Sequence, residues 1–284
     1  MAMNVLLIAS LTLREASRRR LVFTAAIATV VLVALTAFGF HALATMHTGN
    51  GKRIDPHDVL MASSILETMM AFMFSFVLAL AAAFLGALST GAEIENGTLL
   101  AIVPRPIRRA EIMIGKWLGN ALLLAAYAFV IGGLEFAAVR WTTGYLPPHP
   151  LQSLALLVTE GLVLLTLTMA ISVRLSAIAA GFVTVVLFGI AWIAGIVGAF
   201  ATFFHNEGIR SVATAISLII PSDGLWRAAS YSMQPAIVRA TMQPNELNPL
   251  IPNAPPPMPF FLWCAFWFAV VLGAGIGSFQ RRDI

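Results

Sequence analysis

The sequence has little charge and almost no cysteine. Charged residues make up 11% of its 284 residues, and Cys264 is its only cysteine. Soluble globular chains are typically about 25% charged, so this composition excludes an ordinary soluble enzyme, a disordered regulator and a disulfide-rich scaffold. Hydrophobic residues instead account for 59% of the chain. These proportions are typical of an all-α membrane protein that crosses the bilayer several times.

The motifs of several enzyme classes are also missing. The sequence has no GxxxxGK(S/T) nucleotide loop, no HExxH zinc motif and no GxSxG nucleophile motif, and its five histidines are far apart. We therefore expect no catalytic residue, no metal ligands and no cofactor in this chain. The formal net charge of +4 forms no basic stripe, so we expect no nucleic-acid partner.

Six segments are long and apolar enough to cross a membrane, since a spanning helix needs roughly 20 mostly apolar residues. We predict six transmembrane helices over residues 21–45, 63–89, 114–139, 151–173, 176–203 and 259–279. An even number of crossings places both ends of the chain on the same side. Residues 1–284 then form a single transmembrane domain.

Basic residues indicate which side faces the cytoplasm, because arginine and lysine in short loops are retained there. The segments before residue 21, between residues 90 and 116, around Arg174 and after residue 280 hold 11 of the 17 basic residues. We therefore predict a multi-pass protein of the cell membrane with both termini in the cytoplasm. Residues 91–113 form a cytoplasmic loop and residues 204–258 form an outer segment in this topology.

An amphipathic helix precedes the first predicted span. Residues 3–17 place Val5, Ile8 and other apolar side chains at helical spacing, and three arginines end the segment. Such a helix lies along the inner membrane surface with its basic end among anionic headgroups. Membrane lipid is therefore an expected partner.

The loop between the second and third spans contains a short charged helix. Glu93 and Glu95 favour a helix start near residue 91 through the helix dipole. Pro104 and Pro106 cannot lie in a helix interior, so this helix ends by about Val103. A stiff element of this kind can transmit a push from a soluble partner into the membrane. A plain solvated loop that obeys the charge rule is the alternative interpretation.

The loop also resembles a known family. Residues Glu93 to Leu100, Pro104 to Arg109, and Gly115 to Gly119 are similar to the signature of ABC-2 type transporter permeases. Within that family they resemble the multicopper-enzyme-maturation branch. The ending at residues 279–284 is similar to the usual ending of that branch.

The resemblance implies the membrane subunit of an ABC transporter, which performs export or acts on an extracytoplasmic client. A second permease copy, forming a homodimer or a closely related heterodimer, and separate ATP-binding subunits would complete it. Those subunits would bind ATP and magnesium, while residues 1–20 would form an elbow helix and residues 92–103 a coupling helix. The residues that would bind the partner are Glu93, Glu95, Gly97, Thr98, Leu99 and Leu100. The residues that would hold the loop against headgroups are Arg105, Arg108 and Arg109.

Three acids fall inside predicted spans, where an ionised side chain costs about 2.5–3.5 kcal/mol at the bilayer centre. Glu67 and Glu135 lie near outer ends of their spans, so we expect both to reach the headgroups. Glu160 lies deeper and requires an interior partner. It lines a translocation path in one interpretation and forms a structural hydrogen bond in the other.

The outer segment predicts two short helices in the outer leaflet, where the resembled family has its extracellular gate. The first covers residues 209–220, and Ser222 or Asp223 caps the second. Trp226 and Tyr231 on the second helix favour the membrane interface. Residues 244–259 are proline-rich and favour an extended strap.

Glycine spacing and internal repeats bear on packing and on the alternative functions. The pairs Gly115/Gly119 and Gly273/Gly277 allow another helix to approach closely. An ATP-independent secondary transporter or channel is the main alternative function, and it typically contains internal repeats, of which this sequence shows no convincing example. A membrane-embedded enzyme or assembly scaffold is the third possibility.

Overall fold

The protein is described by a computed structural model that covers residues 2–18, 20–45, 55–95, 108–241, 252 and 254–281. All regular secondary structure in these ranges is helical, which confirms the all-α prediction. The helices are α1 (Ala2–Arg18), α2 (Arg20–Thr45), α3 (Pro56–Gly86), the π-helical turn η1 (Ala87–Gly91), α4 (Ala92–Glu95), α5 (Arg109–Thr143), α6 (Pro150–Ser172), α7 (Ala177–Phe203), α8 (Glu207–Ile219), α9 (Ser222–Met233), α10 (Ala236–Thr241) and α11 (Met258–Gln280).

Five of the helices in the described ranges are long and apolar enough to cross a membrane. They are His57–Gly91, Arg109–Thr143, Pro150–Ser172, Ala177–Phe203 and Met258–Gln280, and they coincide with the second to sixth predicted spans. α2 coincides with the first predicted span, and its apolar part with described side chains is Val30–Thr45. The sixth crossing therefore stays a prediction.

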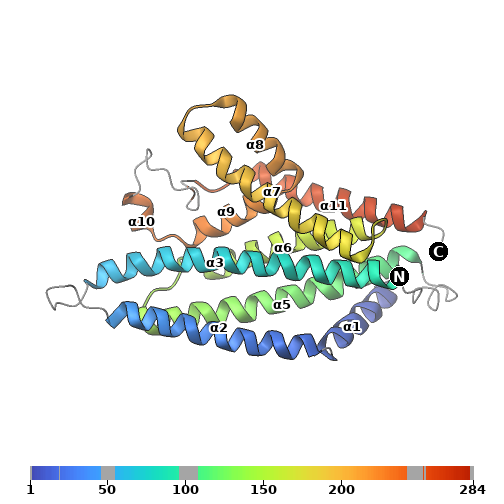
Figure 1. The fold of residues 1–284 in the computed structure, drawn as a ribbon, viewed down its shortest axis with the longest axis horizontal. Helices are drawn as coiled ribbons and strands as arrows, with labels where there is room; N and C mark the ends of the chain where they lie inside the picture. The colour runs from blue at the N-terminus through green and yellow to red at the C-terminus, as the bar shows by residue number, and fades with distance from the viewer. Residues whose placement is uncertain are drawn as a thin grey trace.

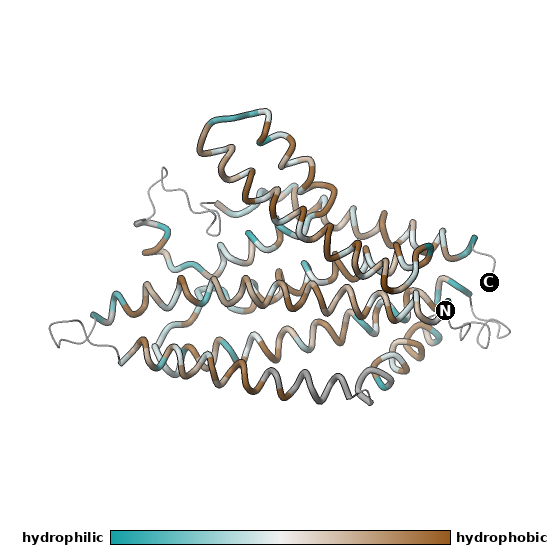
Figure 2. The backbone as a smooth tube through the Cα atoms, in the orientation of Figure 1, coloured by the Kyte–Doolittle hydropathy of each residue, from teal (hydrophilic) through white to brown (hydrophobic). Residues whose placement is uncertain are grey.

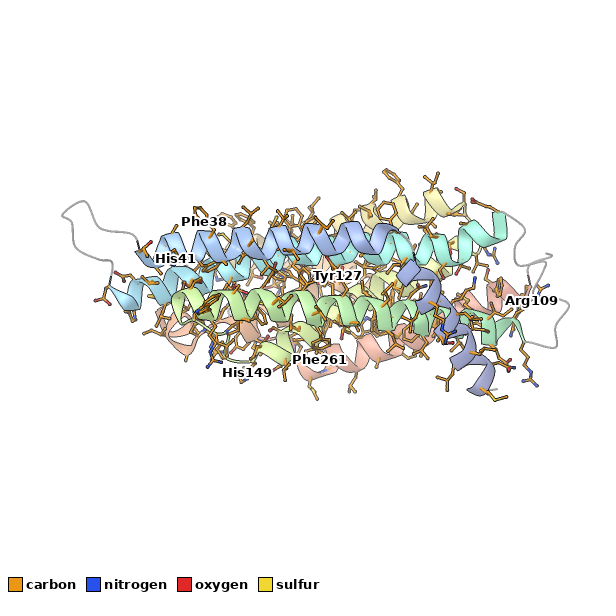
Figure 3. All side chains as sticks on the ribbon, turned by 90° about the horizontal axis from the view of Figure 1, so that it is seen from below. Phe38, His41, Arg109, Tyr127, His149 and Phe261 are labelled. Atoms are coloured by element: carbon orange, nitrogen blue, oxygen red, sulfur yellow. The ribbon has the colours of Figure 1, made fainter. Side chains whose placement is uncertain are left out.

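The long helices lie side by side along one axis of the molecule. Figure 1 shows α1 and the end of α11 at one end, which we call the terminal end, and the start of α3 at the other, which we call the distal end. Figure 2 shows hydrophobic colour along the lengths of the helices and hydrophilic colour mainly at their ends. Arg109 lies at the terminal end, whereas His41 and His149 lie at the distal end (Figure 3).

Local sequence signals set the ends of several helices. Asp55 accepts a hydrogen bond from the His57 N–H, and proline follows it at the first helical position of α3. Ser176 caps α7 by accepting from the Ala179 N–H, and Asn206 caps α8 in the same way. Gly144 ends α5 with a φ of 75°, a left-handed conformation that glycine adopts readily.

α6 is the central helix of the bundle. It contacts α3, α5, α7, α9 and α11, and Leu164 and Leu165 are fully buried. Small residues allow the close contacts, because a Cβ added at Gly86 of α3 would lie 2.8 Å from Thr168 Cβ. The same atom at Gly161 would lie 2.8 Å from a methyl of Leu124. Polar groups on α6 are therefore held deep inside the molecule.

α7 leaves the bundle at an angle, and α8 folds back along it (Figure 1). α9 then returns against α6. The two predicted short helices are thus present as α8 and α9, and the structure adds α10, which the sequence did not predict.

Trp263 and Trp267 of α11 donate hydrogen bonds of 2.8 Å to the carbonyls of Leu218 and Ile219. These indoles satisfy acceptors that the end of a helix otherwise leaves unpaired.

The prediction that Trp226 lies at the membrane interface is wrong. Trp226 is 3% exposed, and its ring centroid lies 5.4 Å from that of Phe72 in the bundle core. The neighbouring helices α6 and α7 cover α9 and bury its aromatic face. Most of the predicted proline-rich strap lies outside the described residues.

Candidate functional site

The candidate site is the group of contacts at the terminal end where the predicted coupling segment begins. Glu95 of α4 accepts a hydrogen bond of 2.8 Å from the Ala177 N–H, the first residue of α7. The first N–H groups of a helix have no partner inside the helix, and its dipole favours a negative charge there. The Glu95 carboxylate therefore joins α4 directly to the start of a membrane-crossing helix.

Gly91 brings the two segments still closer together. A Cβ atom added at Gly91 would lie 2.9 Å from the Ala177 Cα. Real Cβ atoms essentially never approach backbone that closely, so glycine is required for this contact. Glycine and the Glu95 carboxylate thus act on the same residue of α7.

Several predicted partner-binding residues remain predictions. Glu93 lies on α4, but its side chain is outside the part of the chain whose side chains are described. Also outside the described residues are Gly97, Thr98, Leu99, Leu100 and Arg105.

Lys116 holds the π-helical turn η1 that precedes α4. Its Nζ donates a hydrogen bond of 2.8 Å to the Ser89 carbonyl, and the side chain is buried. A π-helical turn displaces carbonyls from the regular α-helical ladder and often occurs at functional sites. Sequence reasoning counted Lys116 among the cytoplasmic basic residues and within the family signature, whereas the structure gives it a specific partner.

Two arginines hold the end of α11 to this junction. Arg109 donates a hydrogen bond of 3.3 Å from Nη1 to the Phe279 carbonyl, and Arg174 donates one of 2.8 Å from Nε to Ser278 Oγ. A positive charge next to the last turn of a helix also complements its dipole. Arg108 lies at the N-cap position of α5 and is exposed. The role of Arg108 and Arg109 at lipid headgroups stays a prediction.

α1 is attached to the first turns of α5. Asn4 donates a hydrogen bond of 2.9 Å to Glu111 Oε2. The opposite face of α1 exposes Met3, Leu6, Leu7 and Leu11. An exposed apolar face on an attached helix is suited to the membrane interface. Sequence reasoning did not single out Asn4, and it gave Glu111 only as the start of the helix that enters the third span and as part of the family signature.

The glycine spacing was a signal for the α1 contact. Cβ atoms added at Gly115 and Gly119 would lie 2.7 Å from Ile8 Cβ and 2.8 Å from Thr12 Cβ. The predicted close approach at this pair is therefore present, and the approaching helix is α1. Around Gly273 and Gly277 nothing lies within 4 Å of an added Cβ, so that pair supports no contact within the described chain.

The acids inside the spans are all buried, which corrects the expectation for two of them. Glu160 accepts a hydrogen bond of 2.8 Å from Ser75 Oγ, as an interior acid requires. Glu67 and Glu135 are 2% and 5% exposed, so they do not extend into solvent. Each faces protein because neighbouring helices cover it, and a position near a span end does not reveal that packing.

Asp223 has a different role from the predicted helix cap. The N-cap of α9 is Pro221, and neither Ser222 nor Asp223 caps the helix. Asp223 instead accepts a hydrogen bond of 2.7 Å from Arg227 Nε, one turn later in α9. Burial raises the pKa of the Asp223 carboxyl above its usual range, and the adjacent Arg227 charge partly opposes that shift.

These observations define a class of protein: a multi-pass helical membrane protein whose spans are joined at the end that holds α1 and the end of α11. The model of the ABC-2 family transporter protein matches residues 6–284, and the chain belongs to this family. No curated protein matches the chain. The family match does not separate branches, so the multicopper-enzyme-maturation branch stays a prediction.

Proposed function

We propose that the chain is the membrane-spanning subunit of an ABC transporter. It couples ATP hydrolysis by a separate ATP-binding subunit to substrate export or to action on an extracytoplasmic client. Family membership supports this proposal, because ABC-2 permeases generally work with an ATP-binding subunit. That partner would contain the site for ATP and magnesium. It would dock at the terminal end of this chain, which faces the cytoplasm in this proposal.

The contact between Glu95 and Ala177 is the observation that carries the proposal. A partner that displaces residues 92–103 moves α4, and α4 is hydrogen-bonded to the first residue of α7. α7 is a 27-residue helix that leads away from the bundle to α8 (Figure 1). Helices are stiff along their axis, so a displacement at the terminal end reaches the α7–α8 connection.

A second permease copy, identical or closely related, would complete the transport unit. The surface of α11 that it or lipid would cover includes Leu262, Phe266 and Val270, which are all exposed. In the assembled transporter α1 would be the elbow helix, α8 and α9 would form the extracellular gate, and Glu160 would lie beside the translocation path. Action on a copper-enzyme client would place the protein in the multicopper-enzyme-maturation branch.

The test is co-purification with the ATP-binding subunit, followed by ATPase assays in lipid. We expect Glu93→Ala and Glu95→Ala to reduce the amount of bound subunit and the substrate-stimulated ATPase rate, while membrane insertion is unchanged. Asp58→Ala is the matched control, because Asp58 is exposed in the first turn of α3, at the distal end of the bundle. Wild-type binding and stimulation in both variants would contradict the proposal.

A thermal unfolding measurement separates two roles of Glu95. Glu95→Ala removes an acceptor from an N–H of α7, which costs about 0.5–2 kcal/mol when a capping side chain is lost. A lower unfolding temperature with normal binding of the ATP-binding subunit would show that Glu95 only stabilises α7. The Glu93→Ala variant then tests the coupling role alone.

A further inference from the structure

Two buried carboxylates lie on α6 and α9, two helices that pack against each other. Glu160 of α6 is 2% exposed, and its Oε1 accepts the hydrogen bond from Ser75 of α3. Asp223 of α9 is 4% exposed, and its Oδ2 accepts from Arg227. α3 and α9 meet here, since the ring centroid of Phe72, one turn before Ser75, lies 5.4 Å from that of Trp226, one turn after Asp223. Three helices, α3, α6 and α9, therefore meet at this position.

Three buried oxygen atoms on α6 and the first turn of α9 have no hydrogen-bond partner among the described residues. They are Glu160 Oε2, Asp223 Oδ1 and Ser222 Oγ. Buried polar atoms are almost always paired, and an unpaired one costs about 1–3 kcal/mol. Two of the three are carboxylate oxygens, which accept hydrogen bonds or bind cations.

Gly195 of α7 closes the fourth side. A Cβ atom at Gly195 would overlap the Asp223 carboxylate, so the absence of a side chain leaves the space that this carboxylate occupies. α7 therefore approaches this carboxylate with its backbone at Gly195. The helices packed against α6 and α9 thus bury both carboxylates.

The charges around Glu160 do not balance. α7, α11 and η1 contain no charged residue, and Glu160 is the only one on α6. Beyond its first turn, the only charged residue of α3 is Glu67. The only charged residue in the middle of α5 is Glu135, since the basic residues of α5 lie near its two ends. Tyr127 of α5 and Cys264 of α11 are titratable but add no positive charge. Among the charged residues that the structure describes on these helices, Arg227 is the one positive group paired with a carboxylate at this site.

We propose that Glu160, Asp223 and Ser222 form a buried binding site for one monovalent cation. Two carboxylates and one guanidinium leave a single negative charge, which a proton on Glu160 or one alkali metal ion between the three oxygens neutralises. A divalent ion does not suit this site, because it would leave a net positive charge in a buried position. This inference does not depend on the proposed ATP-coupled function.

Occupancy of the site controls how firmly α9 is seated. With the cation bound, Asp223 and Glu160 no longer repel each other, and α9 stays against α6 and α7. Without it, two like charges face each other in an environment of low dielectric constant, and α9 is pushed outward. α8 is joined to α9 through Ile220 and Pro221, so it moves with α9.

The experiment is thermal unfolding of the full chain in lipid nanodiscs, as a function of pH and of added sodium or potassium chloride against choline chloride. A proton at the site makes the unfolding temperature fall as pH rises, because the folded state then loses the bound proton. A sodium or potassium ion makes it rise with that salt only. We expect a shift of at least about 2–4 °C, which corresponds to roughly 1 kcal/mol for a chain of this order of size.

Two variants assign the dependence to the site. Glu160→Gln carries no charge, so it should show no dependence and keep the stability that wild type has with the site occupied. Asp223→Asn should weaken the dependence, and Glu207→Gln, the same change at an exposed acid, should keep it fully. Infrared spectroscopy provides a second measurement, since a proton on Glu160 gives a protonated carboxyl band that Glu160→Gln lacks.

The outcomes separate clearly. A pH dependence or an alkali ion dependence that is lost in Glu160→Gln supports the site and identifies its ligand. A dependence that persists in Glu160→Gln would assign it to another acid such as Glu67 and overturn the proposal. A wild-type protein insensitive to pH and to both salts would also overturn it, whether or not the variants fold. None of these measurements uses ATP, so they do not test the proposed transporter function.

Discussion

Gly195 on α7 leaves the space that the Asp223 carboxylate occupies. Other close contacts depend on single small residues in the same way, and Gly91 of η1, which contacts Ala177 at the start of α7, is the clearest case. At these positions a methyl group would have to displace a charged side chain or backbone. These glycines therefore stabilise the fold because their small size lets neighbouring groups approach closely.

We expect Gly195→Ala to lower the free energy of unfolding by about 1–3 kcal/mol, as overpacking of a full site does. The added Cβ overlaps Asp223 and displaces it from Arg227 or from α7. Thermal unfolding in nanodiscs measures the effect. Gly189→Ala on the same helix is the control, because nothing lies within 4 Å of its added Cβ and alanine favours helix by up to about 1 kcal/mol. Equal stability of the two variants would refute this packing interpretation.

At the scale of helices, two glycine pairs with the same spacing differ in whether another helix packs against them. α1 packs against Gly115 and Gly119, whereas a Cβ atom added at Gly273 or Gly277 would have no neighbour within 4 Å in the described chain. The spacing shows that a helix can approach, but the partner depends on where α1 lies. The hydrogen bond from Asn4 to Glu111 then holds α1 in place.

Replacing Gly119 by alanine should loosen α1 from α5. The added Cβ would lie 2.8 Å from Thr12 Cβ and 2.9 Å from the Ala9 carbonyl oxygen, so α1 must shift. Hydrogen exchange measures this, and we expect faster exchange of the backbone amides of Ala2–Arg18. Gly133→Ala on the same helix has free space around its Cβ and should leave that exchange unchanged. Unchanged exchange in both variants would mean that α1 is not held by this contact.

At the scale of the whole molecule, α1 and the end of α11 share one end of the bundle (Figure 1). The start of α8 lies far from that end, on the connection that follows α7 (Figure 1). Arg109 and Arg174 bond to the end of α11 at this end, and the charge rule predicts that it faces the cytoplasm, because the segments on that side of the predicted topology hold 11 of the 17 basic residues. Orientation in the membrane is the global property on which the proposed coupling depends.

Thiol labelling tests this orientation. Cys264 is the only cysteine and is buried, so Cys264→Ala gives a cysteine-free background. In that background we expect Glu207→Cys to react with an impermeant maleimide in intact cells and Arg281→Cys to react only after permeabilisation. Leu165→Cys, at a fully buried position, is the unreactive control. Labelling of both exposed positions from the same side would reject the predicted topology.

The sequence predicted the spans well because a span depends on a local property. The predicted segment 176–203 coincides with Ala177–Phe203, and 151–173 with Pro150–Ser172. The polar contacts were largely missed, because their members are far apart in sequence. Asn4 is 107 residues from Glu111, and Ser75 is 85 residues from Glu160. Glu67, Glu135 and Trp226 were expected at the membrane boundary, and the helices packed around them bury them.

The sequence by itself determined that this is a helical membrane protein, where its long helices lie along the chain, and which family signature it carries. These properties follow from the length and hydrophobicity of continuous segments, which each helix satisfies alone. Only the tertiary structure decided that Glu95 joins α4 to α7 and that Glu160 accepts a hydrogen bond from Ser75. A buried polar group must find its partner on another helix, and that choice depends on how all the helices pack.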